Sequence, residues 1–317
     1  MPVSPKSGTA VGVATGGEGR VKIGIVAPSV YLLPVHVQKI RALAAAQFPD
    51  VELVIHPQVF ARSSNVMGGE TGFTVSNEEV VPDPMRHGHF AGNDAQRRDA
   101  FVEFANREDI DAIWFARGGY GAGRIAPDIL PRLSPVARRK AYMGYSDAGY
   151  LLAALYRAGF PHVAHGPMVV DVNRTGGEEP ASRALAWLSR KDPRALEPSM
   201  RPGDTHVALN LITLAMLVGT PLMPDLSGSV VMVEEVSEYL YSVDRCMFAV
   251  TSSMWRHPPK ELWLGRISDI KDNDRPFGDD EVGIARYWCE RSNIRYGGRA
   301  DIGHDNANKV VPFGRLG

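Results

Sequence analysis

The sequence has few cysteines. Among its 317 residues, only Cys246 and Cys289 are present, and neither lies in a CxxC or a Cys/His spacing. The sequence therefore predicts neither a disulfide framework nor a cysteine-based zinc site. Both cysteines are expected to be buried thiols.

Long apolar runs are also missing. The chain has no stretch of about 18 apolar residues, and its first 20 residues lack the apolar segment of a secretory signal. Those 20 residues are rich in Gly, Ser and Thr and are expected to form a flexible tail. The sequence therefore predicts a cytoplasmic protein that has no membrane partner.

An excess of either charge is lacking as well. Lys and Arg number 35 against 36 for Asp and Glu, which gives a formal net charge of -1. Such a chain has no overall field to attract nucleic acid, so no nucleic-acid partner is expected. Its length exceeds the roughly 250 to 300 residues at which single cores stop growing, which indicates two domains.

Apolar runs alternate with helical patterns in the first half of the chain. Residues 21–27 and 51–57 have strand character, and residues 35–48 between them have helical spacing. Further strands are expected after residue 111 and at residues 141–144. This order predicts an α/β fold, with a Rossmann-like N-terminal domain built on a parallel sheet.

The remaining segments complete the predicted organisation. Residues 58–92 show no periodicity and are interpreted as a long loop, and residues 207–217 are predicted to form a helix. We expect the N-terminal domain at residues 21–172, a linker at 173–205 and a smaller C-terminal α/β domain at 206–317.

Two motifs follow strands of the predicted N-terminal domain. RGGYGAGR begins at Arg117, and its glycines could present N–H groups to an anion, although a plain turn is an equal alternative. It lacks the third glycine of the GxGxxG dinucleotide fingerprint, which argues against a dehydrogenase. GYSD places Ser146 between a strand and a helix, close to a nucleophile elbow, but a helix cap is the alternative.

A serine nucleophile needs a base and an acid. His304 lies in the polar segment DIGHDN, and Glu234 lies at the end of the apolar run VVMV. The alternatives are an inert loop histidine and a rim carboxylate paired with Arg245.

The ordered set of motifs resembles the LD-carboxypeptidase family, which includes murein tetrapeptide carboxypeptidases and microcin immunity peptidases. Nearly the whole chain takes part in the resemblance. The motifs are IVAPS, HFAGNDAQR, IWFARGGYGAGR, GYSD, HGPM, LVGTPLMPDL, VVMVEEVSEYLYSVDR and DIGHD.

The resemblance implies a role for each matching residue. Ser146 would be the nucleophile, His304 the general base and Glu234 the acid that orients it. The backbone N–H groups of Gly119 and Asp147 would form an oxyanion hole. Three further residues are weaker candidates for substrate contacts, namely Arg117, Tyr120 and Glu238.

The implied reaction releases a C-terminal D-amino acid, with D-alanine from a murein tetrapeptide as the first hypothesis. The resemblance implies a small peptide substrate and a homodimer. It implies no metal or other cofactor. A microcin-immunity type peptidase that cleaves a peptidyl-adenylate conjugate is the alternative, as is a non-catalytic binding protein on the same scaffold. One departure concerns Ala208 and Leu209, which stand where the family has glycines.

Overall fold

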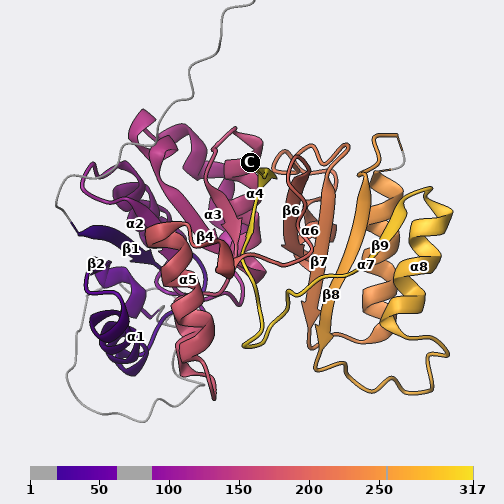
Figure 1. Cartoon of the computed structure of the whole chain (residues 1–317), viewed down its shortest axis with the longest axis horizontal. Helices are drawn as coiled ribbons and strands as arrows, with labels where there is room; N and C mark the ends of the chain where they lie inside the picture. Colours follow the sequence, from indigo (N-terminus) through magenta and orange to yellow (C-terminus); the bar gives the residue numbers. More distant parts are fainter. Residues whose placement is uncertain (1–19, 63–87, 255, 317) are drawn as a thin grey trace, which may run out of the picture.

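The computed structural model describes residues 20–62, 88–254 and 256–316, which form two domains side by side (Figure 1). Residues 1–19 of the predicted tail and residues 63–87 of the predicted loop lie outside the described part. Each domain is built on its own sheet with helices packed against it. The predicted two-domain α/β fold is confirmed.

The N-terminal sheet has six strands in the order β10-β5-β4-β3-β1-β2. Neighbouring strands run parallel except at β10, which is antiparallel to β5. The strands are β1 (Val21–Val26), β2 (Val51–Ile55), β3 (Ala112–Phe115), β4 (Ala141–Gly144), β5 (Val163–His165) and β10 (Val311–Pro312). The order β2-β1-β3-β4-β5 is that of a doubly wound sheet, in which ligands bind at the carboxyl ends of the strands.

Helices cover both faces of this sheet, because its central strands are apolar on both sides. In β3, Ala112 and Trp114 face one core cluster, whereas Ile113 and Phe115 face the other. The helices of the first cluster are α1 (Pro34–Gln47) and α5 (Glu178–Arg190), and those of the second are α2 (Asp94–Asn106), α3 (Ala122–Ile129) and α4 (Gly149–Arg157).

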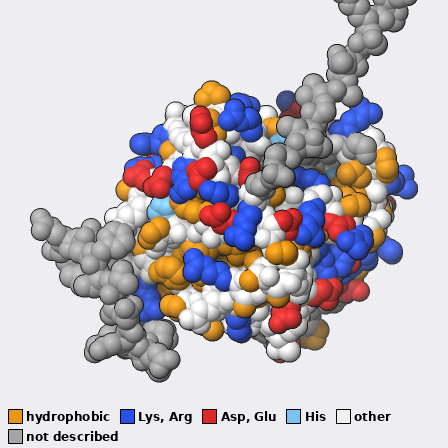
Figure 2. Space-filling view, turned by 60° about the vertical axis from the view of Figure 1, so that its left-hand side comes forward, with side chains coloured by type: hydrophobic (Ala, Val, Ile, Leu, Met, Phe, Trp, Pro, Cys, Tyr) orange, Lys and Arg blue, Asp and Glu red, His pale blue; other side chains and the backbone are white. Residues whose placement is uncertain are grey.

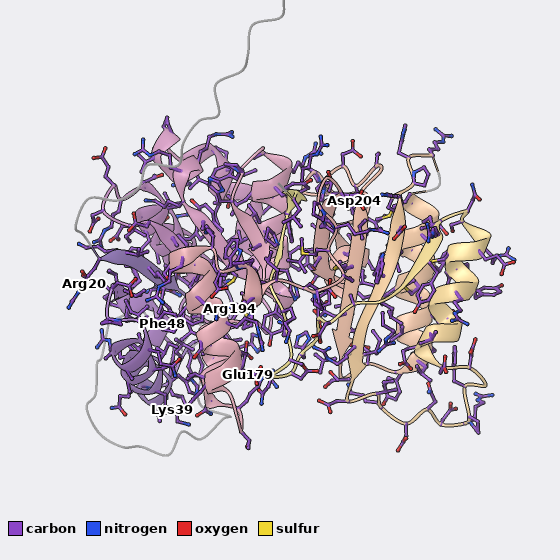
Figure 3. The ribbon with its side chains drawn as sticks, viewed as in Figure 1. Arg20, Lys39, Phe48, Glu179, Arg194 and Asp204 are labelled. Atoms are coloured by element: carbon purple, nitrogen blue, oxygen red, sulfur yellow. The ribbon has the colours of Figure 1, made fainter. Side chains whose placement is uncertain are left out.

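Helix α5 lies within the predicted linker but packs on the N-terminal domain. The guanidinium of Arg190 lies 5.2 Å from the ring centroid of Phe48, the residue that follows α1. Figure 3 shows the two helices adjacent, with Phe48 and Glu179 labelled. The crossing to the second domain therefore comes after α5, and Asp204 precedes the first strand there (Figure 3).

The C-terminal sheet has five strands in the order β11-β6-β7-β8-β9. They are parallel except that β11 is antiparallel to β6. The strands are β6 (Thr205–Asn210), β7 (Val230–Val236), β8 (Glu261–Ser268), β9 (Arg295–Arg299) and β11 (Gly314–Arg315), and the helices are α6 (Leu211–Leu217), α7 (Leu240–Ser253) and α8 (Glu281–Arg291). The short 3-10 helices all precede β6 along the chain and are η1 (Pro57–Phe60), η2 (Leu130–Arg132), η3 (Pro135–Arg139), η4 (Ser146–Ala148), η5 (Val169–Asn173) and η6 (Pro193–Ala195).

One predicted element is wrong. Residues 207–217 were expected to form a helix, but residues 207–210 belong to β6 and only Leu211–Leu217 is helical. A short apolar run that is buried on both faces cannot be told from a buried helix by its period. Asn210 marks the true boundary, because its side chain accepts a hydrogen bond from the N–H of Thr213 at 3.0 Å and caps α6.

The C-terminal segment joins both sheets. After β9 the chain returns toward the N-terminal domain, as the yellow trace in Figure 1 shows. There Val311 pairs with His165 of β5, and Gly314 then pairs with His206 of β6. One core cluster of buried residues also runs from α2, α3 and α4 into the C-terminal domain. The two domains therefore share both apolar contacts and strand pairing.

The surface agrees with the balanced composition. On the face shown in Figure 2, basic and acidic side chains are interspersed. Within the described residues, no helix combines the length and apolar character needed to cross a bilayer. Cys246 and Cys289 are both free thiols, of which Cys289 is buried and Cys246 partly buried.

Candidate active site

Ser146 lies on a sharp turn between β4 and α4. It begins η4 with a φ of +58°, a left-handed conformation that costs a residue with a side chain about 1 to 2 kcal/mol. Neither η4 nor α4 begins with a side-chain cap hydrogen bond. The alternative interpretation of Ser146 as a helix cap is therefore wrong, and the strained strand-turn-helix geometry is that of a nucleophile elbow.

The glycine-rich loop lies directly against Ser146. A Cβ atom on Gly118 would come within 3.0 Å of both Cβ and Oγ of Ser146, so a side chain there would force Ser146 or the loop to shift. The next residue, Gly119, has a φ of +106°. The loop is therefore more than a plain turn, because it forms one wall of the space around the Ser146 hydroxyl.

The side chain of Asp147 ties together three loops at the carboxyl ends of β1, β3 and β4. It is buried, and its Oδ2 accepts hydrogen bonds from Ser29 Oγ at 2.5 Å and from the N–H of Ala122 at 2.8 Å. Sequence reasoning singled out Asp147 only for its backbone. Its carboxylate fixes the turn that carries Ser146 relative to the glycine-rich loop.

A buried arginine supports the same loops. Arg97 of α2 is fully buried and donates hydrogen bonds to the carbonyls of Pro28 at 2.5 Å and Gly121 at 2.7 Å. It also pairs with Asp94. Sequence reasoning did not assign Arg97 a role, although it ends the motif HFAGNDAQR. Its partners lie 24 and 69 residues away, a distance that no local pattern reports.

Glu234 and His304 meet near the carboxyl end of β7, the central strand of the C-terminal sheet. Glu234 is fully buried in β7, and its Oε2 lies 2.5 Å from Nδ1 of His304. The other carboxylate oxygen, Oε1, has no hydrogen-bond partner among the described residues. Arg245, the alternative partner of Glu234, instead donates to Ser242 Oγ at 3.1 Å. Two residues that are distant in sequence are thus paired as an acid and a base.

The pKa of His304 is raised above its usual value of 6.5. Burial alone would lower this pKa, but it is outweighed by the charge and the hydrogen bond of Glu234, with smaller contributions from Glu235 and Asp171. The imidazolium form is therefore stabilised in the folded protein. This is the environment that a general base needs when it must hold a proton during a reaction.

Tyr145 connects the two halves of the site. It immediately precedes Ser146, and its ring centroid lies 4.8 Å from that of His304. Its hydroxyl donates a hydrogen bond to Asp171 Oδ1 at 3.0 Å. In the described part of the chain, no direct hydrogen bond joins Ser146 to His304. Catalytic hydrogen bonds of free enzymes are often long and tighten only when substrate binds.

Two backbone N–H groups beside Ser146 are free to bind an anion. Those of Gly119 and Asp147 form no hydrogen bond with any other described residue. A side chain at Gly119 would be strained, because its φ is +106° and a Cβ there would lie 2.5 Å from Cγ2 of Val30. These are the two groups for which the family resemblance implies a role in an oxyanion hole.

The weaker candidates lie at different places. Arg117 is partly buried, forms no ion pair within the described residues, and its charge lowers the pKa of the buried His36 after the larger effect of burial. Tyr120 is 55% exposed and its ring lies near those of His89 and Phe90. Glu238 is partly buried just beyond β7.

Leu209, which replaces a glycine expected from the family, belongs to the core. It is 1% exposed, and its side chain lies 3.1 Å from where a Cβ of Gly149 would be. The backbone there is an ordinary strand, so no glycine is required by conformation. The substitution fills space between β6 and the start of α4.

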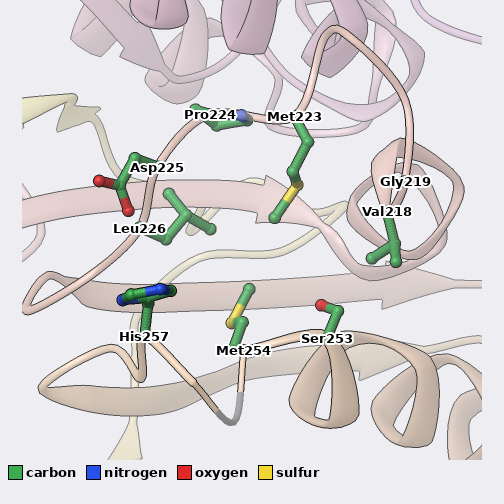
Figure 4. Close-up of a pocket in the computed structure, with 9 residues that line it drawn as sticks. All are labelled: Val218, Gly219, Met223, Pro224, Asp225, Leu226, Ser253, Met254 and His257. Atoms are coloured by element: carbon green, nitrogen blue, oxygen red, sulfur yellow. The ribbon is translucent and has the colours of Figure 1, made fainter.

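Other possible sites are distinct from this one. A cavity of about 200 Å³ is lined by residues of the C-terminal domain, including Asp225 and His257 (Figure 4). None of the residues that line it belongs to the set around Ser146. Within the described residues, no group of three His, Cys, Asp or Glu side chains is placed to hold a metal ion.

Comparison with known proteins agrees with the two-domain arrangement. Residues 23–166 match the family described as LD-carboxypeptidase N-terminal domain, and residues 206–316 match the LD-carboxypeptidase C-terminal domain. The murein tetrapeptide carboxypeptidase of Pseudomonas aeruginosa is 25% identical over 251 residues, which cover 73% of this chain and 79% of that protein.

Solved structures show the same fold. The muramoyltetrapeptide carboxypeptidase from Oxalobacter formigenes superposes with a TM-score of 0.69 at 23% identity, over 92% of this chain and 93% of that one. The microcin C7 self-immunity protein MccF in complex with aspartyl sulfamoyl adenosine gives a TM-score of 0.70 at 16% identity, over 93% and 92% of the two chains.

Proposed function

Because the chain belongs to the LD-carboxypeptidase family, we propose that it is a serine peptidase that hydrolyses the amide between an L-configured centre and a C-terminal D-amino acid. We propose D-alanine release from a murein tetrapeptide as its reaction. The name of the Pseudomonas aeruginosa relative supports this choice of substrate.

The observation that carries the proposal is the 2.5 Å contact between Glu234 and His304, next to a strained serine. A serine hydroxyl is a poor nucleophile unless a base removes its proton. The Glu234 carboxylate fixes Nδ1 of His304, which leaves Nε2 to serve Ser146. The ring contact between Tyr145 and His304 places the imidazole beside the turn that carries Ser146.

The proposed reaction proceeds in two halves. His304 Nε2 takes the proton of Ser146 as Oγ attacks the amide carbonyl carbon, and the N–H groups of Gly119 and Asp147 stabilise the oxyanion. Each such donor contributes roughly 3 to 4 kcal/mol. His304 then gives its proton to the departing amine, and the C–N bond breaks to leave an acyl-enzyme on Ser146.

Water completes the cycle. His304 removes a proton from a water molecule, which attacks the acyl carbon, and the Ser146 oxygen leaves and regains its proton. The Glu234 carboxylate stabilises the imidazolium. Arg117, which has no ion-pair partner among the described residues, is suited to receive the free carboxylate of the D-amino acid.

The test is D-alanine release from a murein tetrapeptide by the purified protein, with the Ser146→Ala variant beside it. A peptidyl-adenylate conjugate is the competing substrate, because a microcin-immunity reaction is the alternative. Turnover of the tetrapeptide that disappears in the variant supports the proposal. Turnover of the conjugate alone would move the assignment to the immunity reaction, and inactivity of a folded protein on both would favour a binding protein.

A further inference from the structure

Strand β8 has an irregularity opposite Glu234. Val233 of β7 pairs with Leu264, whereas Glu235 pairs with Ile267, so two β8 residues lie opposite Glu234 alone. These are Gly265 and Arg266. β-bulges of this kind occur next to active sites, where they redirect a side chain.

The bulge brings the His304 loop close to Glu234. A Cβ on Gly265 would lie 2.8 Å from the carbonyl oxygen of Ile302 and 3.0 Å from Cβ of Glu234, so the three backbones meet without room for a side chain. The N–H of Arg266 donates a hydrogen bond to the Ile302 carbonyl at 2.9 Å. Ile302 itself is fully buried.

The Arg266 side chain forms hydrogen bonds with this loop on both sides of His304. Its Nη1 donates to Asp301 Oδ1 at 2.6 Å and its Nη2 donates to Asp305 Oδ1 at 2.9 Å. Its Nε also bonds the second oxygen of Asp305. Such forked, charge-assisted contacts with carboxylates are geometrically specific, and a lysine cannot reproduce them.

The two carboxylates depend on Arg266 to different degrees. Asp301 has a second cation, since Lys309 Nζ lies 3.5 Å from its Oδ2. For Asp305, Arg266 is the one ion-pair partner within the part of the chain that the structure describes. Gly303 packs on the same guanidinium, because a Cβ there would lie 2.9 Å from Arg266 Nε. Residues 301, 303 and 305 of the loop therefore all contact the Arg266 side chain.

We propose that Arg266 is a positioning residue, which clamps Asp301 and Asp305 so that His304 keeps its contact with Glu234 and its second nitrogen remains available to Ser146. The catalytic part of this statement rests on the proposed function. Arg266 acts through the position of His304 and is not proposed to contact the substrate. Its loss is therefore expected to slow the chemical step rather than to weaken substrate binding. Displacement of a reacting group by about 1 Å can reduce a rate on the order of 100-fold.

The test compares Arg266→Gln and Arg266→Lys with the unchanged protein by NMR titration of labelled histidine. The His304 signal is assigned by its absence in His304→Gln. Loss of a nearby positive charge would by itself raise the pKa of His304, whereas a looser contact with Glu234 lowers it. We expect the pKa to fall in both variants, and to fall less in Arg266→Lys.

Kinetics supply the second readout. We expect kcat of Arg266→Gln to fall about 10- to 100-fold with KM nearly unchanged, and Asp305→Asn to show a smaller change in the same direction. Arg190→Gln is the matched control, because it removes a forked ion pair with Asp50 that lies away from the site. A cooperative thermal unfolding transition is the control that each variant is folded.

The outcomes separate this proposal from the proposed function. If the unchanged protein does not cleave the tetrapeptide, the proposed function fails, but the His304 titration still decides the role of Arg266. A pKa of His304 that is unchanged or higher in folded Arg266→Gln and Arg266→Lys overturns the positioning role. So does a rise in KM alone.

Discussion

The carboxylate of Glu234 and the imidazole of His304 lie 2.5 Å apart although 70 residues separate them in sequence. Glu234 follows four buried apolar residues of β7, and His304 lies in a loop that follows β9. Their contact makes the charge state of one residue depend on the other, and this dependence leads to a prediction about pH.

Activity should fall as the pH drops through the pKa of His304. The base must be neutral to accept a proton, and its pKa in the folded protein is above 6.5, so the acid limb of kcat/KM should have its midpoint above pH 6.5. Glu234→Gln removes the charge that raises this pKa. The midpoint of the acid limb of this variant should move to lower pH, and its kcat should fall on the order of 10⁴-fold. A pH–rate profile of both proteins checks this, and an unmoved midpoint contradicts it.

The same raised pKa also affects stability. A group whose pKa is higher in the folded than in the unfolded state stabilises the fold fully below the unfolded value of about 6.5. This contribution is lost as the pH rises through the folded pKa. The difference in unfolding free energy between the unchanged protein and His304→Gln should therefore shrink between pH 6 and pH 9, as measured by urea unfolding. A difference that grows with pH would rule out the assigned direction.

Ser146 should make the folded protein less stable than a glycine at this position would. Its φ of +58° strains any residue with a Cβ, so Ser146→Gly should be more stable than Ser146→Ala by about 0.5 to 1 kcal/mol. Both variants should lose activity. Urea unfolding of the two variants, which differ by one methyl group, makes the comparison direct. Equal stability would show that the turn is unstrained.

Gly118→Ala should damage catalysis more than folding. The new methyl group would press against Ser146 Cβ and Oγ at 3.0 Å and displace this proposed nucleophile. We expect kcat to fall roughly 10- to 100-fold and stability to fall by about 1 to 3 kcal/mol. Gly123→Ala, whose methyl group would meet only the ring of Tyr150 at 3.3 Å, serves as the control. Equal activity of the two variants would count against this role of Gly118.

Leu209→Ala should lower stability by about 3 kcal/mol, because the side chain is buried and its removal leaves a cavity. Leu209→Gly should cost roughly 1 kcal/mol more through backbone entropy. KM for the tetrapeptide should stay near that of the unchanged protein. A clear drop in KM, with little loss of stability, would instead mean that Leu209 restricts the substrate.

The fold could be predicted where the pattern of apolar residues was unambiguous. The alternation of apolar runs with helical patterns was enough to predict the N-terminal domain. Strand β6 was mistaken for the start of a helix, and β9 was not predicted, since RYGGR is partly exposed and rich in glycine. In both cases burial and pairing, which are tertiary effects, decided the conformation.

The site was only partly visible in the sequence. Ser146 has a local signature, and the resemblance to a family pointed to Glu234 and His304, which no spacing connects. The groups that hold the site in place were missed, namely the side chains of Asp147, Arg97 and Arg266. Their partners come from loops 24 to 118 residues away, so the sequence alone does not show that they meet.

The strand β10 has a consequence for the protein during its synthesis. It pairs with β5 but lies at Val311–Pro312, so a chain emerging from the ribosome exposes the open edge of β5 until residues 311 and 312 have been made. Such an edge can pair with other chains. Glu234 and His304 are also made after Ser146, so the nascent chain carries the proposed catalytic set only after residue 304 has been made.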